Sequence, residues 1–286
     1  MKKKKRLFLF AAYDHEGIID DSTIYYVGEL SKIGDVVYFQ DNEVAKSELE
    51  KISSLVLFAQ AERHGEYDFG SHKRSYLWAR DNNLLDNYDW TYMVNDSVYG
   101  PLFPLLPVLE KLEISNANVV GMTYAARKKV PHIQSWFIGV SNKISTSEWF
   151  NTFMASIVKQ KKKDNTIRLY EIGFSVLCRE KGFDFVPVAI IRRRWHRTYT
   201  NPEYLFKKGV PFFKKSAFTY RDGVAGRQVL YILNNTQPNL QEVIIRNAER
   251  VYGKDNVCNA LTKNIFRIFY RNIRHTVKKI FRKRKK

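Results

Sequence analysis

Three polar residues, Asn95, Asp96 and Ser97, directly follow the apolar run 90–94. An enzyme that breaks a nucleotide-sugar bond must neutralise the departing diphosphate, and a carboxylate that holds a divalent cation is one way to do so. Asp96 could hold such a cation, directly or through water. Because the motif has a single carboxylate, a metal-free site with Lys or Arg is also open, as is a strand-end turn without chemistry.

Two further polar segments could contact the same ligand. The loop 62–70 contains Arg63, which can pair bidentately with a phosphate, and Asp68, whose carboxylate can accept from sugar hydroxyls. Its glycines would let a ligand approach the backbone closely. Tyr13 and Asp14 follow the first apolar run of the chain. Each segment could equally be an ordinary polar loop.

Glu171 is the candidate general base. We expect it at the start of a helix, where it could remove the proton from an acceptor hydroxyl that attacks an anomeric carbon. A carboxylate in the first turn of a helix also has a purely structural explanation, because the helix dipole favours it there. His132, at the entry to an expected strand, could contact a sugar or a phosphate, or could be structural.

Composition excludes several other classes. With 44% hydrophobic residues the chain can bury a core, so disorder throughout is excluded. The two cysteines, Cys178 and Cys258, form no disulfide framework, and the six histidines show no zinc spacing. The apolar run after the basic residues 2–6 is too short for a secretory signal, and no stretch approaches the length of a membrane span.

The order of patterns predicts the elements that would position these residues. Strands are expected at 7–12, 36–39, 55–58, 90–94, 119–123, 133–140 and 185–188, and helices at 20–34, 47–52, 71–79, 149–158 and 170–181. This alternation predicts an α/β fold with a mostly parallel central sheet flanked by helices. Ligands of such sheets bind beyond the carboxyl ends of the strands, where Tyr13-Asp14, the loop 62–70 and Asn95–Ser97 are expected.

The C-terminal segment carries much of the net charge of +19. Residues 263–286 contain eleven Lys or Arg and no Asp or Glu, and large apolar residues recur among them every three or four positions. This pattern predicts an amphipathic basic helix on an anionic membrane surface. A helix docked on the body and a nucleic-acid arm are the alternatives. We therefore expect one domain at 1–255 and an appended membrane-associating helix and tail at 256–286.

Several segments in a fixed order resemble the rhamnan synthesis F family of bacterial glycosyltransferases. They are YDHEGIIDD (13–21), GEYDFGS (65–71), VNDSVYGP (94–101), HIQSWF (132–137), YEIGFS (170–175) and GVPFFK (209–214). Each segment is short, but the ordered set is specific and covers residues from about 7 to 220.

The resemblance implies a GT-A-like glycosyltransferase that uses a nucleotide-sugar donor, dTDP-β-L-rhamnose, and a polyprenyl-diphosphate-linked saccharide acceptor in surface polysaccharide synthesis. Inversion at the sugar needs one base, and the resemblance assigns that role to Glu171. The implied donor-binding residues are Tyr13, Asp14, Arg63, Asp68, Asn95, Asp96, Ser97 and His132. Asn95–Ser97 departs from the common two-aspartate metal motif, so a requirement for Mg²⁺ or Mn²⁺, held by Asp96, stays open.

The resemblance also gives the tail a purpose, because a lipid-linked acceptor lies at the membrane. The expected location is cytoplasmic, peripheral on the inner face of the bacterial plasma membrane, with no nucleic-acid partner. Two other readings stay open: a non-catalytic scaffold of a polysaccharide synthase complex, and a transferase that uses another nucleotide sugar.

Overall fold

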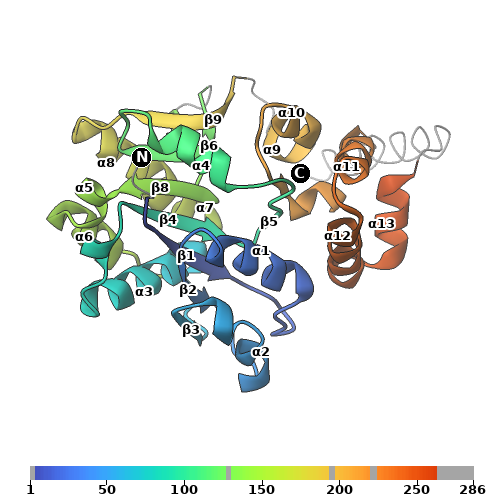
Figure 1. Ribbon diagram of the computed structural model, residues 1–286, viewed down its shortest axis with the longest axis horizontal. Helices are drawn as coiled ribbons and strands as arrows, with labels where there is room; N and C mark the ends of the chain where they lie inside the picture. The colour runs from blue at the N-terminus through green and yellow to red at the C-terminus, as the bar shows by residue number, and fades with distance from the viewer. Residues whose placement is uncertain (1–3, 127–129, 193–196, 220–223, 263–286) are drawn as a thin grey trace. The chain divides into compact units, whose positions relative to one another are not determined.

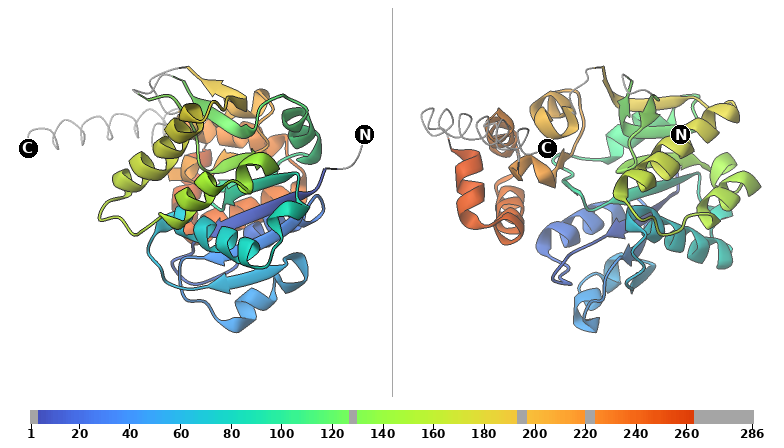
Figure 2. Two further views of the ribbon diagram at one scale, coloured as in Figure 1. Left: turned by 90° about the vertical axis from the view of Figure 1, so that its left-hand side faces the viewer. Right: turned by 180° about the vertical axis from the view of Figure 1, so that it is seen from behind.

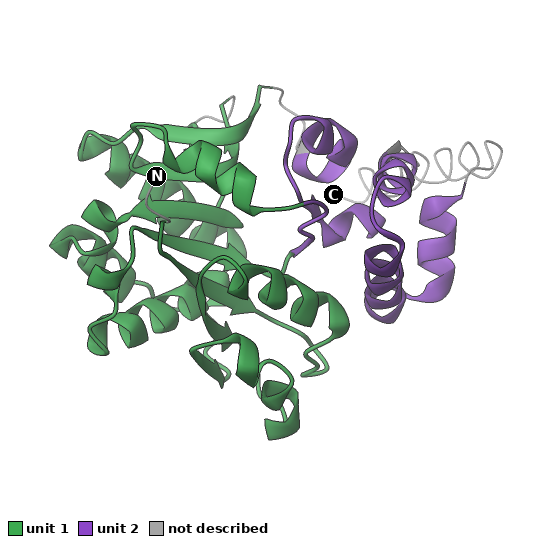
Figure 3. Cartoon of the chain, in the orientation of Figure 1, with its two compact units in different colours: residues 1–97, 104–192 green, residues 98–103, 193–286 purple. Residues whose placement is uncertain are grey.

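The computed structural model describes residues 4–126, 130–192, 197–219 and 224–262. The chain forms two compact units (Figure 3). Unit 1 contains residues 1–97 and 104–192, and unit 2 contains residues 98–103 and 193–286. The boundary expected at residue 255 falls inside a helix, Lys254–Leu261. The appended helix and tail stay a prediction, because residues 263–286 lie outside the described part.

Unit 1 is built on a sheet whose strand order is β3-β2-β1-β4-β8-β6-β7, with β9 also paired to β6 (Figure 1). Its first half is parallel and consists of β1 (Arg6–Ala12), β2 (Asp35–Gln40), β3 (Phe58–Ala61) and β4 (Trp90–Asn95). Continuous apolar runs form β1 and β4, and an almost continuous run forms β2, because helices cover both faces of the sheet. The expected α/β class with a largely parallel sheet is confirmed.

The second half of the sheet is mixed. Strand β8 (Phe137–Ser141) runs antiparallel between β4 and β6 (Val119–Ala125), and β9 (Phe185–Ile191) is parallel to β6. The prediction of a single strand at 133–140 is wrong. It is divided into β7 (His132–Ile133) and β8, because Gln134–Trp136 leave the ladder where Thr123 bonds both the Gln134 and Trp136 side chains.

Strand β3 also differs from its expected position at 55–58. Ser53–Leu55 form a short turn of helix, and Leu57 is largely exposed. The strand begins at Phe58 and pairs only with β2. An edge strand needs less apolar surface than a central one, so the most apolar run was not the strand.

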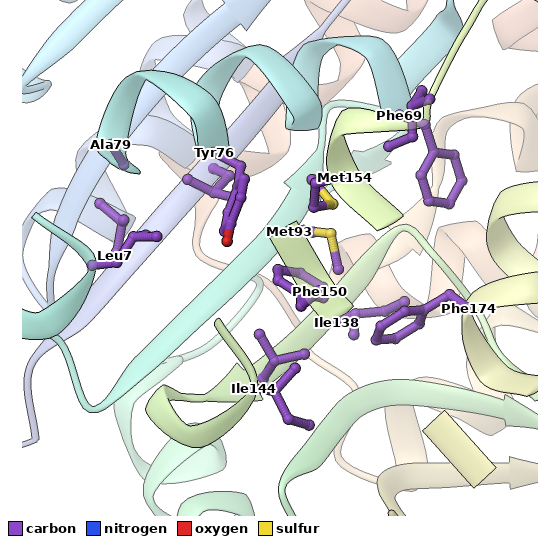
Figure 4. Close-up of a cluster of buried hydrophobic side chains, with 14 of the residues drawn as sticks. Leu7, Phe69, Tyr76, Ala79, Met93, Ile138, Ile144, Phe150, Met154 and Phe174 are labelled. Atoms are coloured by element: carbon purple, nitrogen blue, oxygen red, sulfur yellow. The ribbon is translucent and has the colours of Figure 1, made fainter. Parts of the chain in front are cut away.

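Helices cover the two faces of the sheet. The first face carries α3 (Tyr67–Asp81), α5 (Asn142–Ser145), α6 (Glu148–Ala155) and α8 (Gly173–Glu180). Figure 2 shows α3, α6 and α8 following one another across the sheet, and their buried side chains form one cluster with Leu7, Leu9 and Met93 (Figure 4).

The opposite face carries α1 (Asp21–Ser31), whose Tyr26 packs on Phe10 of β1 at 5.2 Å between ring centroids. The Asp20 side chain caps α1 by accepting from the backbone N–H groups of Ser22 and Thr23. Two shorter helices lie in connections between strands: α2 (Lys46–Glu50) between β2 and β3, and α4 (Leu106–Glu113) before β6. Successive residues of β1 therefore point to cores on opposite sides of the sheet.

Unit 2 contains a two-stranded antiparallel sheet, β5 (Val98–Tyr99) with β10 (Phe213–Lys214), and the helices α9 (Arg197–Thr200), α10 (Pro202–Lys207), α11 (Val224–Asn234), α12 (Pro238–Tyr252) and α13 (Lys254–Leu261). Tyr99 packs on Phe213 and Phe218 and donates to Asn247 Oδ1. Among the described residues, no helix combines the length and apolarity that crossing a bilayer requires.

Candidate functional site

The polar residues after β4 connect the ends of several elements of unit 1. Asn95 is buried, and its Nδ2 donates to Asp68 Oδ2 at 2.7 Å. Its Oδ1 accepts from the backbone N–H of Ser97 at 3.2 Å and from the Ser97 hydroxyl. Asn95 therefore acts as a connector, and the carboxylates brought to this point are those of Asp68 and Asp96.

Asp68 lies on helix α3 and not in a loop. The polar loop expected at 62–70 ends at Glu66, because α3 begins at Tyr67. Tyr67 adopts a positive φ of 59°, which is rare for a bulky residue, and its ring is exposed. This backbone turn starts the helix early enough for the Asp68 carboxylate to reach Asn95.

Asp96 lies beside the end of β1. Its backbone N–H donates to the Ala11 carbonyl at 3.1 Å, and its Oδ2 accepts from the Tyr13 N–H at 3.2 Å. The Tyr13 ring is half exposed, and the Arg63 guanidinium carbon lies 5.5 Å from the ring centroid. Tyr13, Arg63 and Asp96 thus meet at the carboxyl edge and offer an aromatic face, a cation and a carboxylate.

Asp14 stabilises the loop in which it lies. Its Oδ1 accepts from the N–H groups of Glu16 at 3.0 Å and Ile18 at 3.3 Å, and its own N–H donates to Asn42 Oδ1. In the described part of the chain, Asp14, His15 and Glu16 are the one group of three or more His, Cys, Asp or Glu residues whose ligand atoms all lie within 4.8 Å of one another. Asp96, the predicted metal ligand, is not in that group.

Asp41 is a site residue that the sequence analysis missed. This buried carboxylate follows β2, and its Oδ1 accepts from the backbone N–H groups of His64 at 3.1 Å and Gly65 at 2.7 Å. Its carbonyl oxygen accepts from Arg63 Nη1 at 2.8 Å. Asp41 therefore orders the loop that presents Arg63. The signal was available, because Asp41 follows its strand just as Asp96 follows β4.

Glu171 lies in the interior of a helix, which corrects its expected place at a helix start. Helical structure begins at α7 (Lys163–Thr166), passes through a π-helical segment (Ile167–Ile172) and continues as α8. The helix dipole therefore does not explain this carboxylate, because its effect is confined to the first turn. Its position within a π-helical segment agrees with the frequent use of such turns at functional sites.

Three donors fix the Glu171 carboxylate. Its Oε2 accepts from the Ser135 N–H at 2.8 Å and the Ser135 hydroxyl at 2.6 Å, and its Oε1 lies 3.3 Å from His132 Nε2. His132 Nδ1 lies 2.8 Å from the Val130 carbonyl oxygen, so it must carry a proton to donate there. One further proton is then shared by His132 Nε2 and Glu171 Oε1.

Electrostatics decides where that shared proton resides. Burial alone would raise the pKa of Glu171, but the hydrogen bonds from His132 and Ser135 outweigh burial and lower the pKa below its ordinary value. The Glu171 carboxyl group is therefore ionised at neutral pH. With three of about four acceptor positions used, the ionised carboxylate can still accept one proton.

The Glu171 group and the β4 group lie at the same edge of the sheet. The Asn95 N–H donates to the Trp136 carbonyl at 3.3 Å, and Trp136 follows Ser135. On the α3 side, the rings of Phe69 and Tyr170 lie 5.7 Å apart, next to Asp68 and Glu171 in the chain. All nine residues predicted for the site belong to unit 1.

A divalent cation at this edge would rely on Asp96. Burial first, and the Asp96 charge second, raise the pKa values of Tyr26 and Tyr38 well above the ordinary value. The carboxylate thus creates a negative potential that a cation would relieve. Mg²⁺ commonly binds through one protein carboxylate and completes its shell with substrate phosphates and water. Asp96 suits that arrangement, and does not suit an all-protein metal cage.

The sequence of these segments matches that of a known family over most of the chain. Residues 36–282 match the family described as Rhamnan synthesis protein F. The chain belongs to this family. The expected family is thereby confirmed.

Individual relatives are distant. The uncharacterized protein y4gN of Sinorhizobium fredii is 23% identical over 174 residues, which are 60% of this chain and 45% of that protein. The matched region thus spans less than half of the relative's length.

Two solved structures are similar at low TM-scores. A nucleotide-diphospho-sugar transferase from Desulfovibrio desulfuricans has a TM-score of 0.37 and 15% identity, covering 73% of this chain and 96% of its own. Core-mannan synthase A from Aspergillus fumigatus, in its Mn/GDP form, has a TM-score of 0.34 and 12% identity, covering 66% and 72%. Such values transfer no residue roles to this chain.

Proposed function

We propose that this member of the Rhamnan synthesis protein F family is an inverting glycosyltransferase that moves L-rhamnose from dTDP-β-L-rhamnose to a lipid-linked saccharide. The observation that carries the proposal is the meeting, at one sheet edge, of two sets of groups. Tyr13, Arg63, Asp68 and Asp96 suit a nucleotide sugar, and the ionised Glu171 suits a general base.

The donor would bind across the ends of β1, β2 and β4. Tyr13 offers an aromatic face for the base, and Arg63 offers a guanidinium for a phosphate. Asp68 accepts hydrogen bonds from ribose or sugar hydroxyls. Asp96 would hold Mg²⁺ or Mn²⁺, and the cation would supply positive charge where negative charge develops on the leaving group.

The transfer is a single displacement. The acceptor oxygen attacks the anomeric carbon from the face opposite the diphosphate, and its proton passes to Glu171. The bond from that carbon to the diphosphate oxygen breaks, and its electron pair leaves with dTDP. His132 and Ser135 hold the Glu171 carboxylate in one orientation and keep it ionised.

The acceptor accounts for the proposed location. A saccharide on a polyprenyl diphosphate lies at the cytoplasmic face of the plasma membrane. The basic, periodically apolar sequence 263–286 supports peripheral binding to anionic lipid there. These residues lie outside the described part of the structure, so the sequence pattern is the support for this contact.

The decisive experiment measures binding and slow hydrolysis of a panel of nucleotide sugars by calorimetry and chromatography, with Mg²⁺, with Mn²⁺ and with chelator. We expect selective binding of dTDP-rhamnose, a binding loss of about tenfold or more in Asp96→Asn, and little change in the exposed variant Glu43→Gln. Absence of binding by any nucleotide or nucleotide sugar would refute the transferase. Selective binding of another donor would refute rhamnose alone.

A further inference from the structure

The segment 158–169 of unit 1 presents exposed apolar side chains next to exposed cations. Val158, Ile167 and Leu169 are 53%, 36% and 42% exposed, and they are three of nine large hydrophobic residues so exposed in the described part of the chain. Lys161, Lys162, Lys163 and Arg168 are exposed among them. We name these seven residues the 158–169 face.

Contacts at its base hold this face in place. The Tyr170 hydroxyl lies 3.0 Å from Val158 N and 3.2 Å from Gln160 Nε2. From α3, Lys73 Nζ donates to the Ile157 carbonyl at 2.6 Å. Thr166 and Tyr170 are buried on either side of Ile167–Leu169. The face is therefore an ordered surface, and the exposure of its apolar residues is not the result of a loose loop.

A second contact joins this segment to the loop that presents Arg63. Gly65 has a φ of +69°, and a Cβ added to it would lie 3.1 Å from Lys159 Cε. The positive φ favours glycine at this position, and the end of the Lys159 side chain packs against it. Lys163 Nζ lies 5.9 Å from the centroid of the exposed Tyr67 ring. The 158–169 face therefore borders the proposed donor site.

Three of the four cations on this face have no carboxylate partner among the described residues. In the described part of the chain, no carboxylate forms an ion pair with Lys161, Lys162 or Arg168. Asp164 is the one acidic residue within the segment. Cations that lie between apolar side chains match the boundary of an anionic bilayer, where phosphates meet acyl chains and long basic side chains extend to the headgroups.

We propose that the 158–169 face binds an anionic phospholipid bilayer. Lys161, Lys162 and Arg168 contact headgroup phosphates, and Val158, Ile167 and Leu169 enter the acyl boundary. The consequence is positional, because Glu171 lies two residues after Leu169, so its site would lie at the depth of the bilayer surface. This contact is separate from the C-terminal tail, and its test needs neither donor nor acceptor.

A site-specific probe tests this contact in the full chain. Lys162→Cys, in a Cys258→Ser background that leaves only the buried Cys178, carries a polarity-sensitive dye. The matched control carries the dye at Lys46→Cys, on the exposed helix α2. Vesicles of phosphatidylglycerol and phosphatidylcholine should shift the emission of the dye at 162 and leave the dye at 46 unchanged. Binding of the protein without a shift at 162 would overturn the proposal.

Charge reversal provides the second arm. Lys161→Glu with Lys162→Glu should weaken vesicle binding by about 25-fold or more, since each basic residue near the surface contributes about fivefold. The control pair Lys46→Glu with Lys111→Glu changes the net charge equally and should have a small effect. Equal losses in the two pairs, or no vesicle binding by the wild type, would refute the proposal.

The apolar residues provide the third arm. Ile167→Ser with Leu169→Ser should lower vesicle affinity by roughly tenfold, because two aliphatic side chains no longer leave water on binding. Circular dichroism confirms that the variant is folded. A folded variant with unchanged affinity would show that these side chains stay in water, and would overturn their insertion.

Discussion

The two halves of the unit 1 sheet position their polar groups in different ways. In the parallel half, Asp41 and Asp96 accept from backbone N–H groups within a few residues of a strand end. In the mixed half, Glu171 on its helix is held by the His132 side chain of β7 and by the hydroxyl and backbone N–H of Ser135, in the interruption after β7. The first arrangement follows from strand direction, and the second depends on packing between distant segments.

The two arrangements suit two different functions, donor binding and the transfer step. Backbone donors are present whatever the side chains, so the parallel half gives a durable frame for binding. The mixed half places a carboxylate whose ionisation depends on two side chains. We therefore expect substitutions in the parallel half to affect donor binding and stability, and substitutions in the mixed half to affect the rate of transfer.

The largest expected effect is at Glu171. Glu171→Gln keeps the size of the side chain and removes the base, so kcat should fall by about 10²–10⁴-fold while the Kd for the donor stays the same. Single-turnover transfer and calorimetric donor binding measure the two quantities. Ser135→Ala is the matched control, because it removes one of three donors and should cost roughly tenfold. Full turnover by Glu171→Gln would show that Glu171 is not the general base.

The next effect is at Asp41. Asp41→Ala leaves the partly buried N–H groups of His64 and Gly65 without their acceptor and removes a buried carboxylate, which should lower the free energy of unfolding by about 2–4 kcal/mol. Donor binding should weaken as well, since the loop carrying Arg63 loses its anchor. Chemical denaturation measures the first effect. The exposed neighbour Glu43→Ala should change stability by no more than about 0.5 kcal/mol, and a similar loss in both variants would contradict the anchor.

The smallest effect is a difference in acid sensitivity between the halves. His72 on α3 is buried, and burial lowers its pKa from 6.5 to about 3. Because the folded state disfavours the charged ring, the stability contributed by neutral His72 is complete above pH 6.5. It is lost as the pH falls from 6.5 towards 3, by at most about 1.4 kcal/mol per pH unit.

Glu171 also loses its contribution on acidification, but in a lower pH range. Its pKa is lowered from the ordinary 4.5, so its contribution is complete above pH 4.5 and is lost below it. Urea denaturation at pH 7, 6, 5 and 4 measures the free energy of unfolding at each pH. Between pH 6.5 and 5 this free energy should fall less steeply for His72→Leu than for the wild type. The slope for Glu171→Gln should differ from that of the wild type only below about pH 4.5. Parallel profiles for the wild type and His72→Leu would disprove the assignment to His72.

Sequence reasoning succeeded where a side chain directly follows a buried strand. The run 7–12 and the run 90–94 are continuously apolar, and β1 and β4 formed there, so Tyr13 and Asp96 were found at the carboxyl edge. The reasoning failed for β3, where the more apolar residues 55–57 lie outside the edge strand. Local hydrophobicity does not report whether a strand has one neighbour or two.

The other failures share a cause, because they depend on contacts between distant residues. The division of the expected strand 133–140 comes from Thr123 on β6, and it places Ser135 against Glu171. The early start of the helix that carries Glu171 depends on a π-helical turn that no propensity indicates. The predicted tail, the donor sugar and the role of each site residue stay predictions.

The position of strand β5 in the chain affects the order in which the protein can fold during synthesis. It begins directly after Ser97, yet its partner β10 and its neighbours Phe218 and Asn247 are more than a hundred residues further along the chain. At about 5–20 residues per second, a ribosome adds that much chain in roughly 5–20 s. During synthesis, the parallel half of unit 1 can thus assemble well before residues 98–103, which follow Asp96, meet their partners in the rest of unit 2.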